Sequence, residues 1–337
     1  MEQLITTITP KIDPEKEKKR REKRLVKTVA FSVGLAFSLM LILPSIAVAL
    51  LTDLAEITKT TNLLATLYKD QVFLNVFNIV LSVIAFVLPC AFVPRSCDTN
   101  LSAVLPFKKP EKGTFWPTVF MGLGFCAFGN LATSSISEIF SGFGIEFTTW
   151  ESPIPSGVFQ IGLAVLASAV TPALIEEFAM RGVVGGVLKP FGEGFAIMVS
   201  SVIFALMHCN FVQIPFAFIV GLALGFALIK TKSLWAPILI HFLNNAISVV
   251  LEALLAGNEF VTLKTVVFTL YFAVCFGLFF IGLFLASKKE DFFKLSGGNL
   301  SLTAGEKALA FFFSPTVILA ILLVIYESSA TVTLTFI

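Results

Sequence analysis

Long apolar runs recur along the whole chain, and they constrain the fold more than any other feature of the sequence. The first covers residues 28–51. At about 1.5 Å of rise per residue, a helix of that length crosses the roughly 30 Å hydrocarbon core of a bilayer. Only 14% of the residues are charged, against about 25% in an ordinary soluble domain. Because helices satisfy their own backbone groups in lipid, the sequence predicts an all-α polytopic membrane protein.

The apolar runs predict about 8–9 transmembrane helices. They cover residues 28–51, 71–94, 115–137, 157–187, 195–211, 214–230, 235–256, 262–286 and 306–326. A kink is expected at Pro172 in the fourth run, because proline removes a helical hydrogen bond. Thr303 and Glu306 form a T-x-x-E capping box before the ninth run. The loops are short, so no separate soluble domain is expected.

The distribution of basic residues predicts the orientation. Nine of the 24 Lys and Arg lie in residues 1–27, which we interpret as a basic cytoplasmic tail, disordered or loosely helical, in front of a transmembrane domain at 28–337. With the N-terminus inside, the segments predicted to be cytoplasmic hold 21 basic residues and the external ones hold three. The external loop 138–156 carries three acidic residues and no basic one. The positive-inside rule therefore predicts a cytoplasmic N-terminus.

Several features carry no predicted chemistry. The five cysteines form no C-x-x-C and are expected to be reduced, buried apolar side chains: Cys90, Cys97, Cys126, Cys209 and Cys275. Gly221 and Gly225 form a G-x-x-x-G that we interpret as a helix-packing motif. No basic patch interleaved with aromatic residues occurs outside the tail, so nucleic acid is not an expected partner.

Ionisable side chains inside the apolar runs are functional candidates, because charge is costly in hydrocarbon. In the fourth run, Glu177 and Arg181 are spaced i,i+4, which favours an ion pair on one helix face. Glu176 lies about 100° further round the helix and faces elsewhere. The chain has two histidines, His208 and His241. The alternative interpretation of the acidic pair is a charged cluster at the inner end of a helix.

A polar stripe marks one face of the seventh run. Its members are His241, Asn245, Ser248 and Glu252. Such a stripe either joins helices by hydrogen bonds or lines a wet cavity. On the fifth run, His208 shares a face with Ser201 and Phe204, and a lone histidine there can also be a packing residue. Cys209 points off this face, so a thiol nucleophile is not expected.

These side chains suit peptide hydrolysis. The reaction needs a base that activates water and donors where the tetrahedral oxyanion forms. Glu176, His208, His241 and Asn245 supply that set. An alternative assignment places a divalent metal such as Zn²⁺ on His208 and His241, with a carboxylate as third ligand or base. Either assignment needs a water-accessible cavity among the fourth to seventh runs, which we expect to open toward the cytoplasm.

The three short motifs resemble those of the CPBP (Abi) family of intramembrane peptidases, which are related to the CAAX-processing endoprotease. They read E-E-x-x-x-R (176–181), F-x-x-x-H (204–208) and H-x-x-x-N (241–245). Their order and spacing are similar to the family pattern, and the resemblance covers about residues 160–252. One departure is Met180, where many members have Phe; this changes packing and removes no catalytic group.

The resemblance implies a catalytic core of four helices at 157–256. It implies Glu176 as general base, His208 as its partner at the water, and His241 and Asn245 as oxyanion donors. Glu177, Arg181 and Phe204 would support the site. Family members are often described as metallopeptidases, yet the glutamate–histidine scheme needs no metal, so both assignments stay open. The implied partners are membrane lipid and a peptide substrate, such as a prenylated C-terminus or a peptide precursor, in the bacterial plasma membrane.

A different class of function uses the same cavity: a small-solute transporter, or a non-catalytic immunity or scaffold protein. A transporter favours paired internal repeats, and none occurs in the sequence. H-E-x-x-H, G-x-S-x-G and G-x-G-D motifs are also missing from the sequence, so other intramembrane protease classes fit less well. One geometric difficulty is that His208 lies about 20 Å along a straight fifth helix. It meets Glu176 only if that helix tilts or starts deeper, or if Glu176 lies well below the surface.

Overall fold

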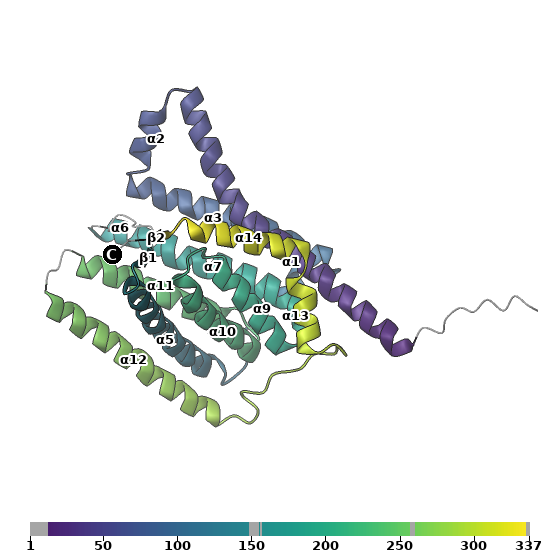
Figure 1. Ribbon diagram of the computed structural model, residues 1–337. Helices are drawn as coiled ribbons and strands as arrows, with labels where there is room; N and C mark the ends of the chain where they lie inside the picture. Colours follow the sequence, from purple (N-terminus) through teal and green to yellow (C-terminus); the bar gives the residue numbers. More distant parts are fainter. Residues whose placement is uncertain (1–12, 148–154, 156, 257–259, 335–337) are drawn as a thin grey trace, which may run out of the picture.

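The computed structural model describes residues 13–147, 155, 157–256 and 260–334, and these are almost entirely helical (Figure 1). Seven helices are long and apolar enough to cross a membrane, or eight if one bent pair counts as a single span. In the described part of the chain the strands are β1 (Ile145–Phe147) and β2 (Val332–Leu334), an antiparallel pair with Glu146 opposite Thr333. The prediction of an all-α polytopic membrane protein is confirmed.

The long helices follow the predicted runs closely, with ends that differ by a few residues. They are α1 (Pro14–Ile57), α3 (Gln71–Ser96), α5 (Phe115–Ser141), the composite segment Gly157–Phe191, α10 (Gln213–Thr231), α11 (Trp235–Leu255) and α12 (Val261–Ser287). The shorter ones are α2 (Thr61–Leu67), α4 (Leu101–Val104), α9 (Glu193–Leu206), α13 (Ala304–Phe312) and α14 (Pro315–Ser329).

Helix α1 is far longer than the predicted run 28–51. It has 44 residues, about 66 Å of helix, although about 20 residues suffice to span a bilayer. Asp13 caps its first turn by accepting from the Glu15 N–H at 3.0 Å. The described part of the basic tail is therefore a regular extension of the first helix. Residues 1–12 of the predicted tail lie outside the described residues, as does Glu151 of the predicted acidic loop.

The fifth predicted span, 195–211, is a shorter helix. Helix α9 has 14 residues, about 21 Å, which is less than a full crossing. It ends at Leu206, and Cys209 then takes a positive φ of 46°. Asn210 turns the chain into α10 by accepting from the N–H groups of Val212 and Gln213. The described chain thus holds seven or eight candidate spans where nine were drawn from the apolar runs.

The last predicted span, 306–326, is bent. Helices α13 and α14 meet at 70°. Ser314 at the bend is extended, with ψ 135°, because the residue before a proline is disfavoured in the helical region. The capping box at the start of α13 forms as predicted: Thr303 accepts from the Glu306 N–H at 3.2 Å, and Glu306 accepts from the Thr303 N–H at 2.8 Å.

The segment Gly157–Phe191 is one helical rod with two wider π-type stretches. Its pieces are α6 (Gly157–Val165), η1 (Leu166–Val170), α7 (Thr171–Glu177), η2 (Phe178–Val184), α8 (Gly185–Leu188) and η3 (Lys189–Phe191). The irregularity expected at Pro172 takes the form of the π stretch η1. Pro172 has no N–H for the carbonyl of Ser168, and the Thr171 hydroxyl donates to the Leu166 carbonyl at 2.8 Å.

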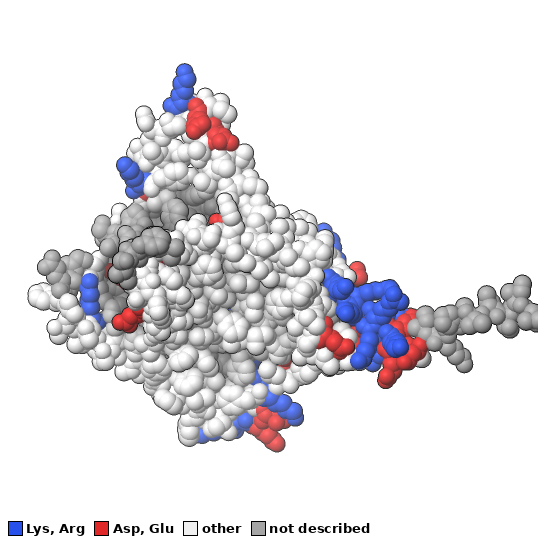
Figure 2. All heavy atoms as spheres, in the orientation of Figure 1, with Lys and Arg blue, Asp and Glu red and all other residues white. Residues whose placement is uncertain are grey.

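The segments predicted to be cytoplasmic meet at one end of the molecule, which we call the basic end. It comprises residues 14–27, 105–114, 189–193, 230–234 and 288–306. The contacts that join them include Lys19–Glu306, Glu22–Ser301, Phe191–Lys307, Glu193–Ser296 and Glu111–Lys232. On the face in Figure 2, charged side chains gather there, at the far tip by α2 and near the start of α12, with a wide uncharged surface between. Which end faces the cytoplasm stays a prediction.

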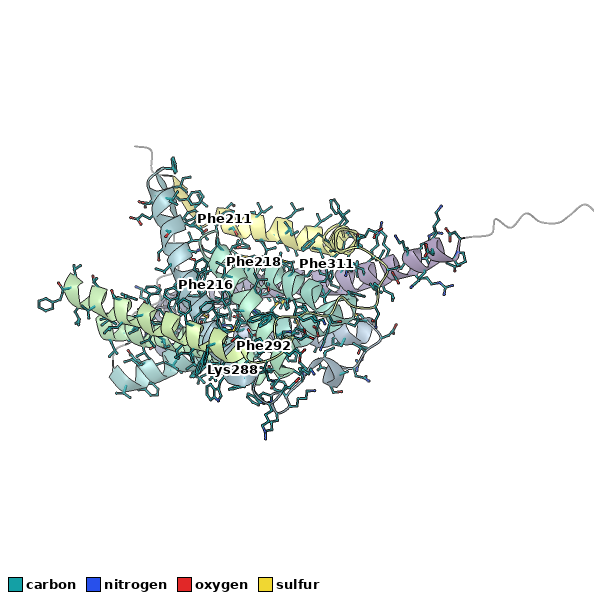
Figure 3. All side chains as sticks on the ribbon, turned by 90° about the horizontal axis from the view of Figure 1, so that it is seen from below. Phe211, Phe216, Phe218, Lys288, Phe292 and Phe311 are labelled. Carbon is teal, nitrogen blue, oxygen red and sulfur yellow. The ribbon has the colours of Figure 1, made fainter. Side chains whose placement is uncertain are left out.

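Close helix crossings build the core around the composite segment. Helix α14 packs on α1 where Ser38 donates to the Thr316 carbonyl at 3.3 Å. Helix α5 packs against both α10 and α12. The chain after α12 folds back over α10, because Phe292 packs on Phe226 with ring centroids 5.9 Å apart. Figure 3 labels Phe292 and Lys288 at this place.

Candidate active site

A tight turn at Gly192 sets the heights of Glu176 and His208. The composite segment ends at Phe191 and α9 begins at Glu193, so the two helices form a hairpin. Glu176 precedes Gly192 by 16 residues and His208 follows it by 16, which places both at a similar height in antiparallel helices. Gly192 has φ 120°, and a Cβ there would lie 2.7 Å from the carbonyl oxygen of Gly297. The turn therefore requires glycine, and the difficulty of depth disappears.

Glu177 lies at the centre of the cluster. Its side chain is 0% exposed, and its Oε1 lies 3.1 Å from Nη1 of Arg181 and 2.9 Å from Nδ1 of His241. The i,i+4 ion pair expected from the spacing is thus formed. Because a buried carboxylate is stable only with charged or hydrogen-bonded partners, this side chain fixes α11 against the composite segment.

Arg181 is held from three sides. Besides the ion pair, its guanidinium carbon lies 4.1 Å from the centroid of the Phe204 ring, and Nη2 donates to the Gly221 carbonyl at 3.4 Å. A desolvated cation–π contact of this kind contributes about 2 kcal/mol. A Cβ at Gly221 would lie 3.0 Å from Cβ of Ser201. Gly221 therefore allows α9 and α10 to pack closely, as predicted, and also supplies a carbonyl to the site.

Glu176 differs from its neighbour Glu177. Its side chain is 15% exposed, and its Oε2 lies 3.9 Å from Nε2 of His241, too far for a hydrogen bond. This Oε2 is buried and makes no hydrogen bond to any described residue. Since buried polar atoms are normally satisfied, the oxygen is available to accept a hydrogen bond from a water or a substrate.

His208 is oriented by the backbone of its own helix. Its Nδ1 lies 2.8 Å from the Phe204 carbonyl oxygen. The carbonyl can only accept, so Nδ1 carries the hydrogen and the lone pair of the neutral ring is on Nε2. The Phe204 ring meets both imidazoles edge-on, with centroids 5.2 Å from His208 and 5.9 Å from His241. Phe204 therefore links both histidines to Arg181.

Asn245 is positioned by a carbonyl that Pro172 leaves free. Its Nδ2 donates to the Ser168 carbonyl at 3.1 Å, the group that a residue other than proline at position 172 would engage in a regular helix. Its Oδ1 accepts from Nδ2 of Asn244 at 3.0 Å. One amide hydrogen of Asn245 remains for a substrate. Ser168 and Asn244 were not predicted; the proline four residues after Ser168 was the available signal.

The rest of the polar stripe on α11 lies elsewhere. Ser248 and Glu252 line a cavity of about 760 Å³ between α5, α11 and α12, where Lys264 also lies. Ser201, which shares the face of His208, donates to the Ile197 carbonyl instead of joining the cluster. Cys209 is a free thiol that donates to the Leu206 carbonyl at 3.7 Å. None of these side chains reaches the glutamates.

A second cavity, of about 220 Å³, lies at the basic end between the composite segment, α9, α10 and the region of α4. Arg181 lines it, so it reaches the support of the cluster from that end. Glu176, His208, His241 and Asn245 line neither this cavity nor the one beside α12. The water-accessible cavity expected at these residues, among the fourth to seventh runs, therefore stays a prediction.

The alternative zinc assignment needs three ligands close together among the described residues. No three His, Cys, Asp or Glu side chains gather among them in a way that could hold a metal ion. Nδ1 of His241 is bound by Glu177 and Nδ1 of His208 lies against the Phe204 carbonyl, which leaves Nε2 of both rings free. An occupied Nδ1 is the usual arrangement of a metal-binding histidine. The cluster thus has two oriented imidazoles beside one available carboxylate, and the metal alternative stays open.

Comparison with known proteins supports the family resemblance. Residues 158–247 match the family described as Type II CAAX prenyl endopeptidase Rce1-like, and all three motifs fall inside the match. This match confirms the resemblance to the CPBP family over that part of the chain. Glu176, His208, His241 and Asn245 all lie within it.

Two relatives extend the comparison. The chain is 29% identical over 158 residues to the membrane-embedded CAAX protease MroQ of Staphylococcus aureus strain USA300. The aligned residues make up 44% of this chain and 63% of MroQ. It is 27% identical over 93 residues to YdiL of Bacillus subtilis strain 168, whose name describes a membrane peptidase. That alignment covers 27% of this chain and 38% of YdiL. The chain therefore spans less than two thirds of either relative. No solved structure matches it.

Proposed function

We propose that the chain is an intramembrane endopeptidase that hydrolyses a peptide bond near the membrane face with a water activated by Glu176 and His208. One observation carries the proposal. Of the two adjacent glutamates, Glu177 is 0% exposed and its Oε1 is held by Arg181 and His241, whereas Glu176 is 15% exposed and its Oε2 lies 3.9 Å from His241, beyond hydrogen-bond distance. Oε2 of each glutamate lacks a hydrogen-bond partner among the described residues, but only the carboxylate of Glu176 is both partly exposed and free of a close ion pair, so a water can reach it.

The proposed reaction uses each group once. Water is held between Glu176 and Nε2 of His208 and attacks the peptide carbonyl carbon while Glu176 takes its proton. Negative charge then develops on the carbonyl oxygen, toward which His241 donates through a protonated Nε2 and Asn245 through its second amide hydrogen. The C–N bond breaks as the proton on Glu176 passes to the leaving amine. The products are a free carboxylate and a free amine.

Glu177 and Arg181 act as positioning residues in this scheme. The Glu177 carboxylate accepts from Nδ1 of His241 at 2.9 Å and fixes the imidazole plane, as the buried carboxylate of a serine-protease triad does. Arg181 compensates the charge of Glu177 in a site that water does not screen. Both residues thus act on the substrate only through His241.

The substrate and setting are part of the proposal. The substrate is a peptide or protein segment that reaches the cluster from the membrane, such as a prenylated C-terminus or a peptide precursor. MroQ is named as a membrane-embedded CAAX protease, which supports this substrate class. Both relatives are bacterial, which supports a multi-pass protein of the bacterial plasma membrane with lipid around it and a cytoplasmic N-terminus.

The experiment is cleavage of quenched fluorescent peptides, with and without a prenylated C-terminus, by purified protein in detergent. We expect cleavage by wild type and by Cys209→Ala, loss of cleavage in His208→Ala, and no effect of a chelator. Cys209 is the matched control, because it follows His208 directly and makes no contact with the cluster. Cleavage by His208→Ala at the wild-type rate would overturn the assignment. Inhibition by the chelator that added zinc reverses would favour the metal alternative.

A further inference from the structure

The cavity at the basic end is lined mainly by small and basic residues. Among the described residues that line it, four are basic and none is acidic. The basic ones are Lys108, Arg181, Lys189 and Lys232. Its volume of about 220 Å³ holds roughly seven waters at about 30 Å³ each. A concave site with one sign of charge concentrates ions of the opposite sign.

Arg181 gives the cavity an unsatisfied donor. The side chain is 1% exposed, and its Nε is buried without a hydrogen-bond partner among the described residues. Its ion pair in the described part of the chain is with Glu177, and that carboxylate also pairs with His241. A guanidinium presents donors in a planar fork that matches carboxylate and phosphate oxygens. The cavity therefore has a buried anion-binding group in its wall.

The helix geometry separates this group from the rim. Arg181, Gly185 and Lys189 line the cavity and are spaced i, i+4 and i+8 on one face of the composite segment. Arg181 and Lys189 place a positive charge at each end of this row, and Gly185 between them has no side chain. Arg181 and Lys189 are about 12 Å apart along the helix axis. Lys108 and Lys189 are exposed and make no ion pair in the described part of the chain, unlike Lys232, which pairs with Glu111 at 2.9 Å.

We propose that this cavity binds a phosphate group, with Nε of Arg181 and the ammonium groups of Lys108 and Lys189 as donors to its oxygens. An anionic lipid headgroup and a soluble phosphate share this chemistry. Charge-assisted hydrogen bonds of this kind are the strong ones. Binding at this site requires no peptidase activity, so its test is independent of the proposed function.

The first test measures thermal unfolding of the purified full chain in a zwitterionic detergent by tryptophan fluorescence. Inorganic phosphate is titrated against chloride at equal ionic strength. We expect a saturable rise in Tm for wild type, and binding about tenfold weaker in Lys108→Gln and in Lys189→Gln. Lys109→Gln is the matched control, because Lys109 adjoins Lys108, is exposed and does not line the cavity. It should behave as wild type.

The second test uses nanodiscs of phosphatidylcholine with or without phosphatidylglycerol. A rise in Tm from phosphatidylglycerol that Lys189→Gln loses and Lys109→Gln keeps identifies a lipid headgroup as the source. A rise in the phosphate titration alone identifies a soluble phosphate. The proposal is overturned if neither arm raises Tm of wild type above its control, or if Lys109→Gln loses as much as Lys189→Gln.

Discussion

Replacing Glu177 with glutamine tests whether the buried ion pair holds the site together. The substitution keeps the shape of the side chain and an acceptor for His241, but it leaves the charge of Arg181, 1% exposed, without a counter-ion. Removing one partner of a buried pair costs about 3–5 kcal/mol of unfolding free energy. At about 2 °C per kcal/mol for a chain of this size, Tm should fall by at least about 6 °C.

A double variant separates charge from packing. Glu177→Gln with Arg181→Met removes both charges at similar volume, so its loss of Tm should be smaller than the sum of the two single losses. Glu176→Gln is the adjacent control. Since Glu176 has no ion pair with Arg181, its Tm should stay within about 2 °C of wild type. The measurement is thermal unfolding in detergent by tryptophan fluorescence. A Glu177→Gln variant that melts as wild type, or a double variant whose loss equals the sum, would refute the reasoning.

Three further outcomes are expected from the same unfolding measurement. Gly34→Ala should lower Tm, because the added Cβ would lie 2.5 Å from atoms of α14. At Gly277 an added Cβ meets nothing within 4 Å, so Gly277→Ala should raise the free energy of unfolding by about 0.5–1 kcal/mol. Equal shifts in Tm for the two variants would contradict the close packing of α1 on α14. Phe204→Leu should cost about 2 kcal/mol by removing the ring beneath the buried guanidinium, and an unchanged Tm would argue against that contact. The hydrogen bond from Lys232 lowers the pKa of Glu111 below its ordinary 4.5. That stabilisation exists above the ordinary pKa and is lost as pH falls through the lowered one, so Lys232→Gln should lower Tm at neutral pH and not in acid.

Much of the site could be predicted because it depends on chain order and helix spacing. The i,i+4 interval between Glu177 and Arg181 fixes a shared helix face, and the structure forms that ion pair at 3.1 Å. The polar stripe of α11 places His241 and Asn245 on one face. What the spacing could not give is the partner across helices: Glu177, not Glu176, accepts from Nδ1 of His241.

The length of α9 could not be predicted, because residues 195–211 are mostly apolar and periodicity does not mark an end within such a run. The end is set by Asn210, whose side chain caps the start of α10. The hairpin at Gly192 then fixes the height of His208. The π stretches of the composite segment could not be predicted either. Pro172 is a sequence signal for the first stretch, η1, and the second stretch, η2, has no such signal.

In the proposed mechanism, the two adjacent glutamates let one helix supply both a rigid frame and a reactive group. Glu177 faces α9 and α11 through Arg181 and His241, and its charge is neutralised inside the protein. Glu176, about 100° round the helix, keeps an oxygen unpaired by the described residues, 3.9 Å from His241. Neighbouring carboxylates in different surroundings can therefore take different roles, as acid–base pairs in enzymes do.

The rate of peptide hydrolysis by Glu176→Gln, relative to wild type at an equal folded fraction, tests the central claim most directly. A positioned general base contributes about 10²- to 10⁴-fold. The account therefore predicts that kcat falls at least about 100-fold while Tm is preserved. Cleavage by a folded Glu176→Gln variant at the wild-type rate would contradict it.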